Sequence, residues 1–159
     1  MKKYQRTITY QQAKKVYELT KEFCKKFLDS YKDRRLIDHM NSSGRSYKQN
    51  LAEGALRNSI KHYIDFIGFS RASGEELLED YKDLALEWKI KIIRPSSSSI
   101  SSLSSLPSSR EEAINYLIDL ITRTNYLLDR QRQGLEKYFI KYGGHSENLA
   151  RKRREFRGY

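Results

Sequence analysis

The chain has 159 residues, a formal net charge of +11, 38% hydrophobic and 32% charged residues, and one cysteine. This length is typical of a single domain, and a lone cysteine excludes a disulfide framework within the chain. No apolar run approaches the roughly 20 residues of a membrane-spanning helix, and the basic N-terminus lacks the apolar segment of a signal peptide, so we expect a cytoplasmic protein without membrane contact.

The first predicted element is an amphipathic helix over residues 9–30. Thr9 and Gln12 have the spacing of a capping box at its start. A stripe of core positions then recurs every three or four residues, as on one face of a helix, at Ala13, Val16, Tyr17, Thr20, Phe23, Cys24 and Phe27. This stripe assigns Cys24 to the core as a small packing residue.

A second amphipathic helix is predicted over residues 34–54, followed by a short turn. Residues 42–44, Ser-Ser-Gly, have low helix propensity, so we expect weakening or a kink there unless tertiary packing compensates. Their glycine also permits a neighbouring helix to approach closely. Gly54 is placed to end this helix, and Asn58 or Ser59 is placed to cap the next one.

The third predicted helix spans residues 59–93 and carries one apolar stripe from Ile60 to Ile92. Small residues gather within it at Ser70, Ala72, Ser73 and Gly74. Because the stripe continues past them, we predict an unbroken helix in which they let a neighbouring backbone approach, rather than a loop. Pro95 ends the helix, since proline disfavours helical geometry in the residue before it.

A serine-rich connection over residues 95–109 precedes the fourth predicted helix, over residues 110–142. Serine competes with the backbone for hydrogen bonds and buries little surface, so we interpret this connection as a flexible linker. Its last two serines lie three residues before Glu111 and Glu112, the spacing of a capping box. Two glycines, at residues 143–144, are placed to end the fourth helix.

These elements predict an all-α fold, an up-down-up-down four-helix bundle over residues 1–144 with a Ser-rich loop between helices three and four. The remaining residues, 145–159, form a basic C-terminal tail. The tail has too few apolar groups to pack alone, and we expect it to form a basic helix on contact with a partner.

Positive charge is distributed unevenly along the sequence. Residues 1–30 have a net charge of +5, residues 31–58 have +3, residues 59–142 are balanced, and residues 143–159 have +3. This pattern is typical of a polyanion-binding face, on which lysine and arginine neutralise phosphates and release counterions. The alternative is the solvated surface of a basic protein. The candidate phosphate contacts, expected to converge on one surface, are Lys14, Lys15, Lys21, Lys25, Lys26, Arg34, Arg35, Arg45, Lys48, Arg151, Lys152, Arg153, Arg154 and Arg157.

No arrangement of residues specifies a reaction. The sequence lacks glycine-rich phosphate loops, and His39, His62 and His145 have no metal-ligating neighbour three or four residues away, so we expect neither a cofactor nor a metal within one chain. Arg57 and His62 fit the R-N-x-x-x-H spacing of HEPN-type ribonucleases, in which arginine holds a phosphate and histidine moves a proton. That spacing also occurs by chance, and a structural role at the turn is the alternative. Glu53 either stabilises the turn, by pairing with Arg57 or by capping the helix that follows, or acts as a catalytic base; we favour the structural role.

The centre of the chain resembles a known family. The residues that carry the resemblance are Ser46, Asn50, Glu53 and Gly54, followed by Arg57, Ser59 and Lys61. They are similar to the helix-turn-helix centre of bacterial four-helix-bundle proteins encoded in intervening sequences of large-subunit ribosomal RNA genes. The same family includes the accessory variability protein of diversity-generating retroelements. Lys48 stands where the family often has proline, which bears on the backbone path of the second helix.

The C-terminal half carries a second resemblance, to an extension called the four helix bundle suffix domain. The residues concerned are Asn125 to Gln131, Leu135, Glu136, Phe139, Gly143, Gly144, Glu147, Asn148 and Arg151. Resemblance to the broader family implies a cyclic homo-oligomer, commonly a pentamer. It also implies a basic surface that faces nucleic acid or a reverse transcriptase.

We therefore predict a non-enzymatic, oligomeric helical bundle that binds RNA or DNA through a basic surface, as an accessory to a nucleic-acid-processing enzyme such as a reverse transcriptase. Two alternatives stay open. A protein-interaction scaffold would bind its partner through apolar seams and ignore nucleic acid. A HEPN-like ribonuclease would cleave RNA without metal, through Arg57 and His62.

Overall fold

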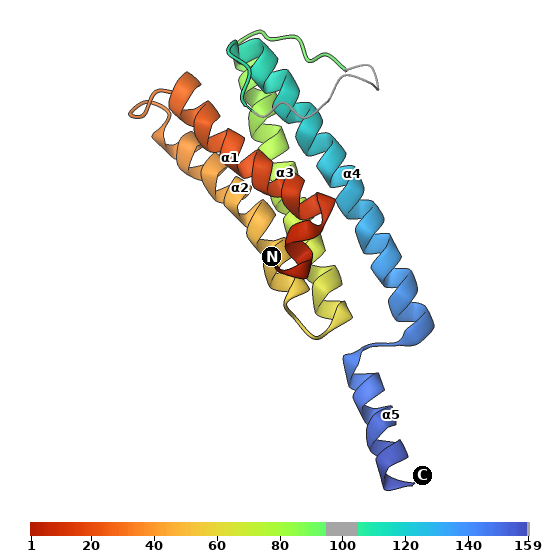
Figure 1. Cartoon of the computed structure of the whole chain (residues 1–159). Coiled ribbons are helices and arrows are strands. Elements are labelled where there is room, and N and C mark those ends of the chain that lie inside the picture. Colours follow the sequence, from red (N-terminus) through yellow and green to blue (C-terminus); the bar gives the residue numbers. More distant parts are fainter. Residues whose placement is uncertain (95–104, 159) are drawn as a thin grey trace.

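The computed structural model describes residues 1–94 and 105–158. Its elements are the 3-10 helix η1 (Lys3–Arg6) and the helices α1 (Ile8–Phe27), α2 (Arg34–Ala55), α3 (Ile60–Glu87), α4 (Arg110–Tyr142) and α5 (His145–Arg157) (Figure 1). The described residues contain no strand, and α1 to α4 pack as a four-helix bundle, which confirms the predicted fold class. No helix within these residues combines the length and the apolar character that a bilayer-spanning segment needs.

Consecutive helices of the bundle run in opposite directions (Figure 1). Near the start of α1, the Thr9 hydroxyl donates to Gln131 of α4 at 2.7 Å. Further along α1, the Gln12 side chain accepts from Thr124 at 2.8 Å. The α4 partner lies earlier in the chain as α1 advances, so the two helices are antiparallel. The same order relates α2 to α3, in the pairs His39–Asp80, Ser43–Glu76 and Tyr47–Ser70.

All four bundle helices contribute to one buried core. Its largest fully buried side chains are Tyr47, Tyr81, Phe23, Met40, Ile67, Leu77, Ile114, Leu117, Ile121 and Leu128. The Thr20 and Tyr81 hydroxyls lie 2.9 Å apart inside this core, and the Tyr47 hydroxyl donates to Asn125 at 2.7 Å. Each bond avoids the cost of roughly 1–3 kcal/mol that an unpaired buried polar group carries. Cys24 is 2% exposed, which confirms its predicted packing role.

The small residues of α3 lie where three helices meet. α3 continues without a break through residues 70–74, as predicted. Gly74 faces Tyr47 of α2 and Asn125 of α4, and a Cβ added there would lie 2.6 Å from the Tyr47 ring. The missing side chain is therefore what allows α3 to pack this closely against α2 and α4.

The low-propensity segment of α2 is also helical. α2 continues through residues 42–44, where Ser43 and Gly44 are buried. A Cβ added to Gly44 would lie 3.2 Å from the Tyr17 ring of α1. Close packing against α1 compensates for the weak propensity of this segment.

The start of α1 differs from the prediction. α1 begins at Ile8, and the Thr7 hydroxyl caps it by accepting from the backbone N–H of Tyr10 at 3.3 Å. The capping box expected at Thr9 and Gln12 is wrong, because both side chains bond to α4 instead.

The end of α1 is also earlier than expected, at Phe27 rather than near residue 30. The Asp29 carboxylate then accepts from the backbone N–H groups of Tyr31 and Lys32, both at 2.9 Å. A short acidic side chain that bonds the backbone in this way favours a turn over continued helix.

Gly54 does not end α2, as the sequence had suggested. α2 continues to Ala55, and Gly54 is buried without a positive φ. A Cβ added to Gly54 would lie 2.6 Å from the Cβ of Phe66 on α3, so this glycine serves close packing rather than helix termination. Ser59 caps α3 as expected, because its hydroxyl accepts from the backbone N–H of His62 at 3.3 Å.

α3 ends at Glu87, earlier than the predicted end at residue 93. Trp88 stacks on Phe23 with ring centroids 6.1 Å apart, and Lys89 then adopts a left-handed φ of 55°. The apolar stripe misled the prediction because Trp88 packs against the core from the turn that follows the helix.

The predicted linker is described only in part, since residues 95–104 lie outside the described residues. Residues 105–109 are not helical, and the Ser109 hydroxyl caps α4 by accepting from the Glu112 backbone N–H at 3.1 Å. Gly143 adopts a φ of 74° and ends α4 at its expected place.

The C-terminal tail is a helix in the single chain, whereas the sequence analysis expected this only on contact with a partner. α5 buries none of its residues, and Figure 1 places it beyond the end of α4, outside the bundle. Glu147 in its first turn and Arg154 and Arg157 in its last turn complement the helix dipole, which favours helix without tertiary packing.

Replacement of Gly74 by alanine is expected to lower the free energy of unfolding by about 1–3 kcal/mol, because the added methyl group overlaps the Tyr47 ring. Gly68 provides the matched control in α3, since a Cβ there meets nothing within 4 Å. Gly68→Ala should stabilise the protein by about 0.5–1 kcal/mol through helix propensity. Urea unfolding of both variants measures the difference, and equal stabilisation would show that Gly74 is not a close contact.

Candidate nucleic-acid interface

The individual helices differ in net charge more than the sums over long sequence segments indicate. α1 carries five lysines against two glutamates, and α2 carries four cationic side chains against two carboxylates. α3 carries three cationic side chains against seven carboxylates. α4 has six against five, and α5 has five against two. The balanced middle of the sequence therefore conceals an acidic α3, and excess cations lie on α1, α2 and α5.

The predicted phosphate contacts form two groups rather than one. The α1 and α2 cations lie on the bundle, whereas the α5 cations lie beyond it, past the end of α4 (Figure 1). The single surface expected from the sequence is not formed, because α4 extends out of the bundle before α5 begins. Lys15 and Lys48 are half-buried, and the exposed predicted contacts are Lys14, Lys21, Lys25, Lys26, Arg34, Arg35, Arg45, Arg151, Lys152, Arg153, Arg154 and Arg157.

A hollow of about 500 Å³ lies between α1 and α2, and we call it the α1–α2 groove. It is lined by Tyr17, Lys21, Cys24, Lys25, Leu28, Ser30, Ile37 and Asn41. The ammonium groups of Lys21 and Lys48 lie 4.5 and 5.4 Å from the centre of the Tyr17 ring. The lining contains two lysines and no carboxylate, so the groove combines positive charge with an aromatic ring and apolar walls.

Glu18 and Asp29, which adjoin lining residues in the sequence, are engaged by other groups. Glu18 lies 3.9 Å from Lys14, one turn away on α1. Backbone hydrogen bonds from Lys32 and Tyr31 lower the pKa of Asp29, so its charge is held by the turn that follows α1. Lys21, Lys25 and Lys48, by contrast, form no ion pair within the described residues.

The floor of the groove is neutral. The carbonyl oxygen of Asn41 is buried and finds no hydrogen-bond donor among the described residues. Burial, and then the nearby Asp80 carboxylate, raise the pKa of the Cys24 thiol to about 12, so this thiol stays protonated at physiological pH. Sequence reasoning did not select Asn41 as a site residue. Its only signal was a polar side chain one helical turn after Ile37, on the apolar stripe of α2.

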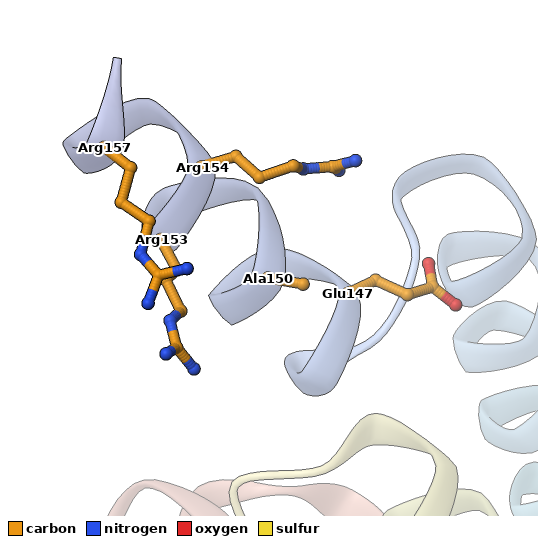
Figure 2. Close-up of a pocket in the computed structure, with 5 residues that line it drawn as sticks. All are labelled: Glu147, Ala150, Arg153, Arg154 and Arg157. Atoms are coloured by element: carbon orange, nitrogen blue, oxygen red, sulfur yellow. The ribbon is translucent and has the colours of Figure 1, made fainter. Parts of the chain in front are cut away.

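α5 forms the second basic region. Figure 2 shows Arg153 and Arg157 extending to the same side of the helix, while Arg154 extends in another direction. Together with Glu147 and Ala150 they line an open hollow of about 510 Å³ along this one helix. None of the described α5 residues is buried, so its exposed guanidinium groups are free to contact phosphates.

The turn between α2 and α3 holds the two residues of the ribonuclease hypothesis. Arg57 donates to the Glu53 carboxylate at 3.3 Å, and its guanidinium lies 5.2 Å from the centre of the Phe66 ring. His62 is exposed, and its backbone N–H is used by the Ser59 cap. No contact in the described structure joins Arg57 to His62, and the pairing of Glu53 with Arg57 agrees with a structural role at the turn.

The family motif lies on one face of the last turns of α2. Ser46, Asn50, Glu53 and Gly54 are spaced by four, three and one residues, which places them side by side on a helix. Gly54 packs against α3 and Glu53 holds the Arg57 side chain, so this face forms the joint between α2 and α3.

The one histidine whose side chain forms a hydrogen bond within the described residues, His39, pairs with a carboxylate of α3. Within residues 1–94 and 105–158, no three His, Cys, Asp or Glu side chains gather as a metal-ligand set. The His39 Nδ1 lies 2.6 Å from the Asp80 carboxylate, which connects α2 to α3. Burial raises the pKa of Asp80, and the bond to His39 opposes that shift.

Comparison with known proteins identifies one family. The family model described as 23S rRNA-intervening sequence protein matches residues 4–93. This range contains α1, α2 and α3 and every residue that lines the α1–α2 groove. The comparison with curated proteins found no match, and the comparison with solved structures found none either.

The Cys24 thiol is expected to react slowly with a disulfide reagent at pH 8. Its raised pKa leaves roughly a thousandfold less thiolate than an ordinary thiol has, and its side chain is buried. Absorbance assays on native and urea-unfolded protein measure the rates. As a control, Ser30→Cys in a Cys24→Ala background places a thiol on the exposed rim and should react at the unfolded rate. Rapid reaction of native Cys24 would mean that the groove floor is open.

Proposed function

Because the chain belongs to the 23S rRNA-intervening sequence protein family, we propose that it is a non-enzymatic helical bundle that binds RNA or DNA through basic surfaces. The observation that carries the proposal is the separation of charge in the fold. Unpaired lysines surround the α1–α2 groove, while the carboxylates concentrate on α3.

The chemistry of the groove suits phosphate. Lysine ammonium groups that lack carboxylate partners attract anions, and each phosphate they neutralise releases condensed counterions. Contacts of this kind position a strand without reading its bases, so we expect low sequence preference from the lysines. Lys21, Lys25 and Lys48 are the central contacts of this region.

α5 supplies a second contact region at a distance from the first (Figure 1). Two separated basic regions on one chain bind a long polyanion more tightly than either region alone, because the second contact becomes intramolecular. The exposed arginines of α5 are suited to this role, since guanidinium groups bind phosphate oxygens in pairs.

We also propose that the chain assembles with copies of itself as a cyclic homo-oligomer, for which the family resemblance indicates a pentamer. Large apolar side chains are exposed near the C-terminus, with Tyr138 at 50%, Tyr142 at 53% and Phe156 at 93%. The Tyr138 and Tyr142 rings lie 4.8 Å apart and form one exposed pair. Exposed apolar patches of this kind mark interaction sites. The family resemblance extends the proposal to a partner that processes nucleic acid, such as a reverse transcriptase.

A protein-interaction scaffold without nucleic-acid binding is the second candidate. The same exposed apolar side chains support it, since they would bind a protein partner equally well. The two candidate functions differ in whether the lysines bind phosphates. Salt-dependent binding of nucleic acid is expected for the first function and not for the second.

Replacement of Lys21, Lys25 and Lys48 by glutamine is expected to weaken nucleic-acid binding and to reduce the slope of log K against log salt by about 2–3, roughly one per lost phosphate contact. The matched control replaces Lys61, Lys82 and Lys137, which removes the same charge elsewhere and should change the slope by less than about 1. Fluorescence anisotropy over a salt series measures both. Equal effects would assign binding to net charge alone, and no binding by the unaltered chain at low salt would favour the scaffold.

Light scattering coupled to size exclusion is expected to give a mass that is a multiple of the 18.9 kDa chain. Tyr138→Ser with Tyr142→Ser should reduce the assembly to monomers without loss of fold, because both side chains are half exposed. Phe69→Ser is the control, since Phe69 is 55% exposed on α3. A monomeric mass for the unaltered chain at all concentrations would contradict self-association.

A further inference from the structure

The α1–α2 groove contains groups that a phosphate does not need. Tyr17 presents an aromatic ring at its side, and Leu28 and Ile37 supply apolar walls. Asn41 adds an amide whose carbonyl oxygen has no donor among the described residues. A site built for phosphate alone would hold cations and N–H donors, so these extra groups indicate a ligand with a flat apolar face and a hydrogen-bond donor.

We propose that the groove receives one unpaired base of a single-stranded nucleic acid, while Lys21 and Lys25 contact the adjoining phosphates. The proposal rests on the proposed function and adds to it the class of nucleic acid and the part of it that enters the groove. In this arrangement the base stacks on Tyr17, and its exocyclic amino or ring N–H group donates to Asn41.

The Tyr17 ring is held in place for stacking. Gly44 of α2 lies directly against it, since a Cβ there would come within 3.2 Å of the ring and 3.5 Å of the Tyr17 backbone. The Lys21 ammonium that now lies 4.5 Å from the ring centre would have to move aside. An exposed cation–π contact is worth roughly 2- to 5-fold in affinity, whereas base stacking on an aromatic side chain is worth roughly 5- to 100-fold. Because stacking contributes more to affinity, a base displaces the Lys21 ammonium from the Tyr17 ring, and the ammonium remains available to contact a phosphate.

Asn41 discriminates between a base and a phosphate. A phosphate group at neutral pH offers acceptors, so it cannot satisfy the unpaired carbonyl oxygen of this amide. Bases carry N–H donors on their Watson–Crick edges, so a base that reaches this amide can donate to its oxygen. Such a bond would supply the donor that this oxygen lacks among the described residues.

The groove size also agrees with a base. Its volume of about 500 Å³ lies in the range of small-ligand pockets. A base in a duplex is stacked and paired, so it presents neither its face to Tyr17 nor its donor to Asn41. The groove therefore favours single strands over duplexes of equal charge.

The experiment compares three fluorescent probes with the full chain at low salt. They are a 15-nucleotide strand of deoxyadenosine, an abasic deoxyribose-phosphate strand with the same number of phosphates, and a duplex of the same length. We expect the adenine strand to bind on the order of 10-fold more tightly than the abasic strand, the range that stacking supplies. We also expect it to bind more tightly than the duplex.

Two variants assign this difference to the groove. Tyr17→Leu removes the ring and Asn41→Leu removes the amide, and each should bring adenine-strand affinity toward that of the abasic strand while abasic binding stays unchanged. Asn41→Leu keeps the test decisive if Tyr17→Leu fails to fold, which circular dichroism would show. The control is Tyr126→Leu, because Tyr126 is 61% exposed on α4, away from the groove. It should leave all three affinities unchanged.

The outcomes separate the two proposals. Equal affinity for adenine and abasic strands overturns the base site and leaves electrostatic binding intact. Loss of the adenine preference in Tyr126→Leu, but not in the groove variants, also overturns it. Absence of binding to every probe at low salt overturns the proposed function itself.

Discussion

Tyr47 connects three of the four bundle helices. From α2, its hydroxyl donates to Asn125 of α4 at 2.7 Å, and its backbone carbonyl accepts from Ser70 of α3 at 2.6 Å. Its ring covers Gly74, which has no side chain to hold α3 away. Burial raises the pKa of the Tyr47 hydroxyl, so it remains a donor at physiological pH. Because these contacts fix one face of α2 against α3 and α4, the opposite face is left to form the groove with α1.

The groove forms because side chains fill the space between α1 and α2 at one level of the bundle and leave it open at another. At Gly44 the two helices are close, since the Tyr17 ring lies against the glycine. One and two turns earlier on α2, Asn41 and Ile37 leave the hollow unfilled. The carboxylate-rich α3 packs against α2, and the lining of the groove itself holds lysines and no carboxylate. Packing and electrostatics therefore favour the same face for an anionic ligand.

The sequence predicted the helices well because each buries one continuous stripe, and a stripe is visible in a single chain. It predicted their ends less well, since Thr9 and Gln12 look like a cap but are recruited by α4. Gly54 has the appearance of a helix stop, and only the position of Phe66 shows it to be a packing contact. The lysines were found from charge alone. Asn41 was missed, because a groove depends on the register of two helices.

The length of α4 sets how the two basic regions work together. Its 33 residues span about 50 Å, and its final turns carry α5 clear of the bundle. This helix acts as a spacer of fixed length between the groove and the arginines. Under the proposed function, an oligonucleotide too short to bridge that interval would engage one end only. A longer strand would engage both, so affinity would depend on the length of the strand.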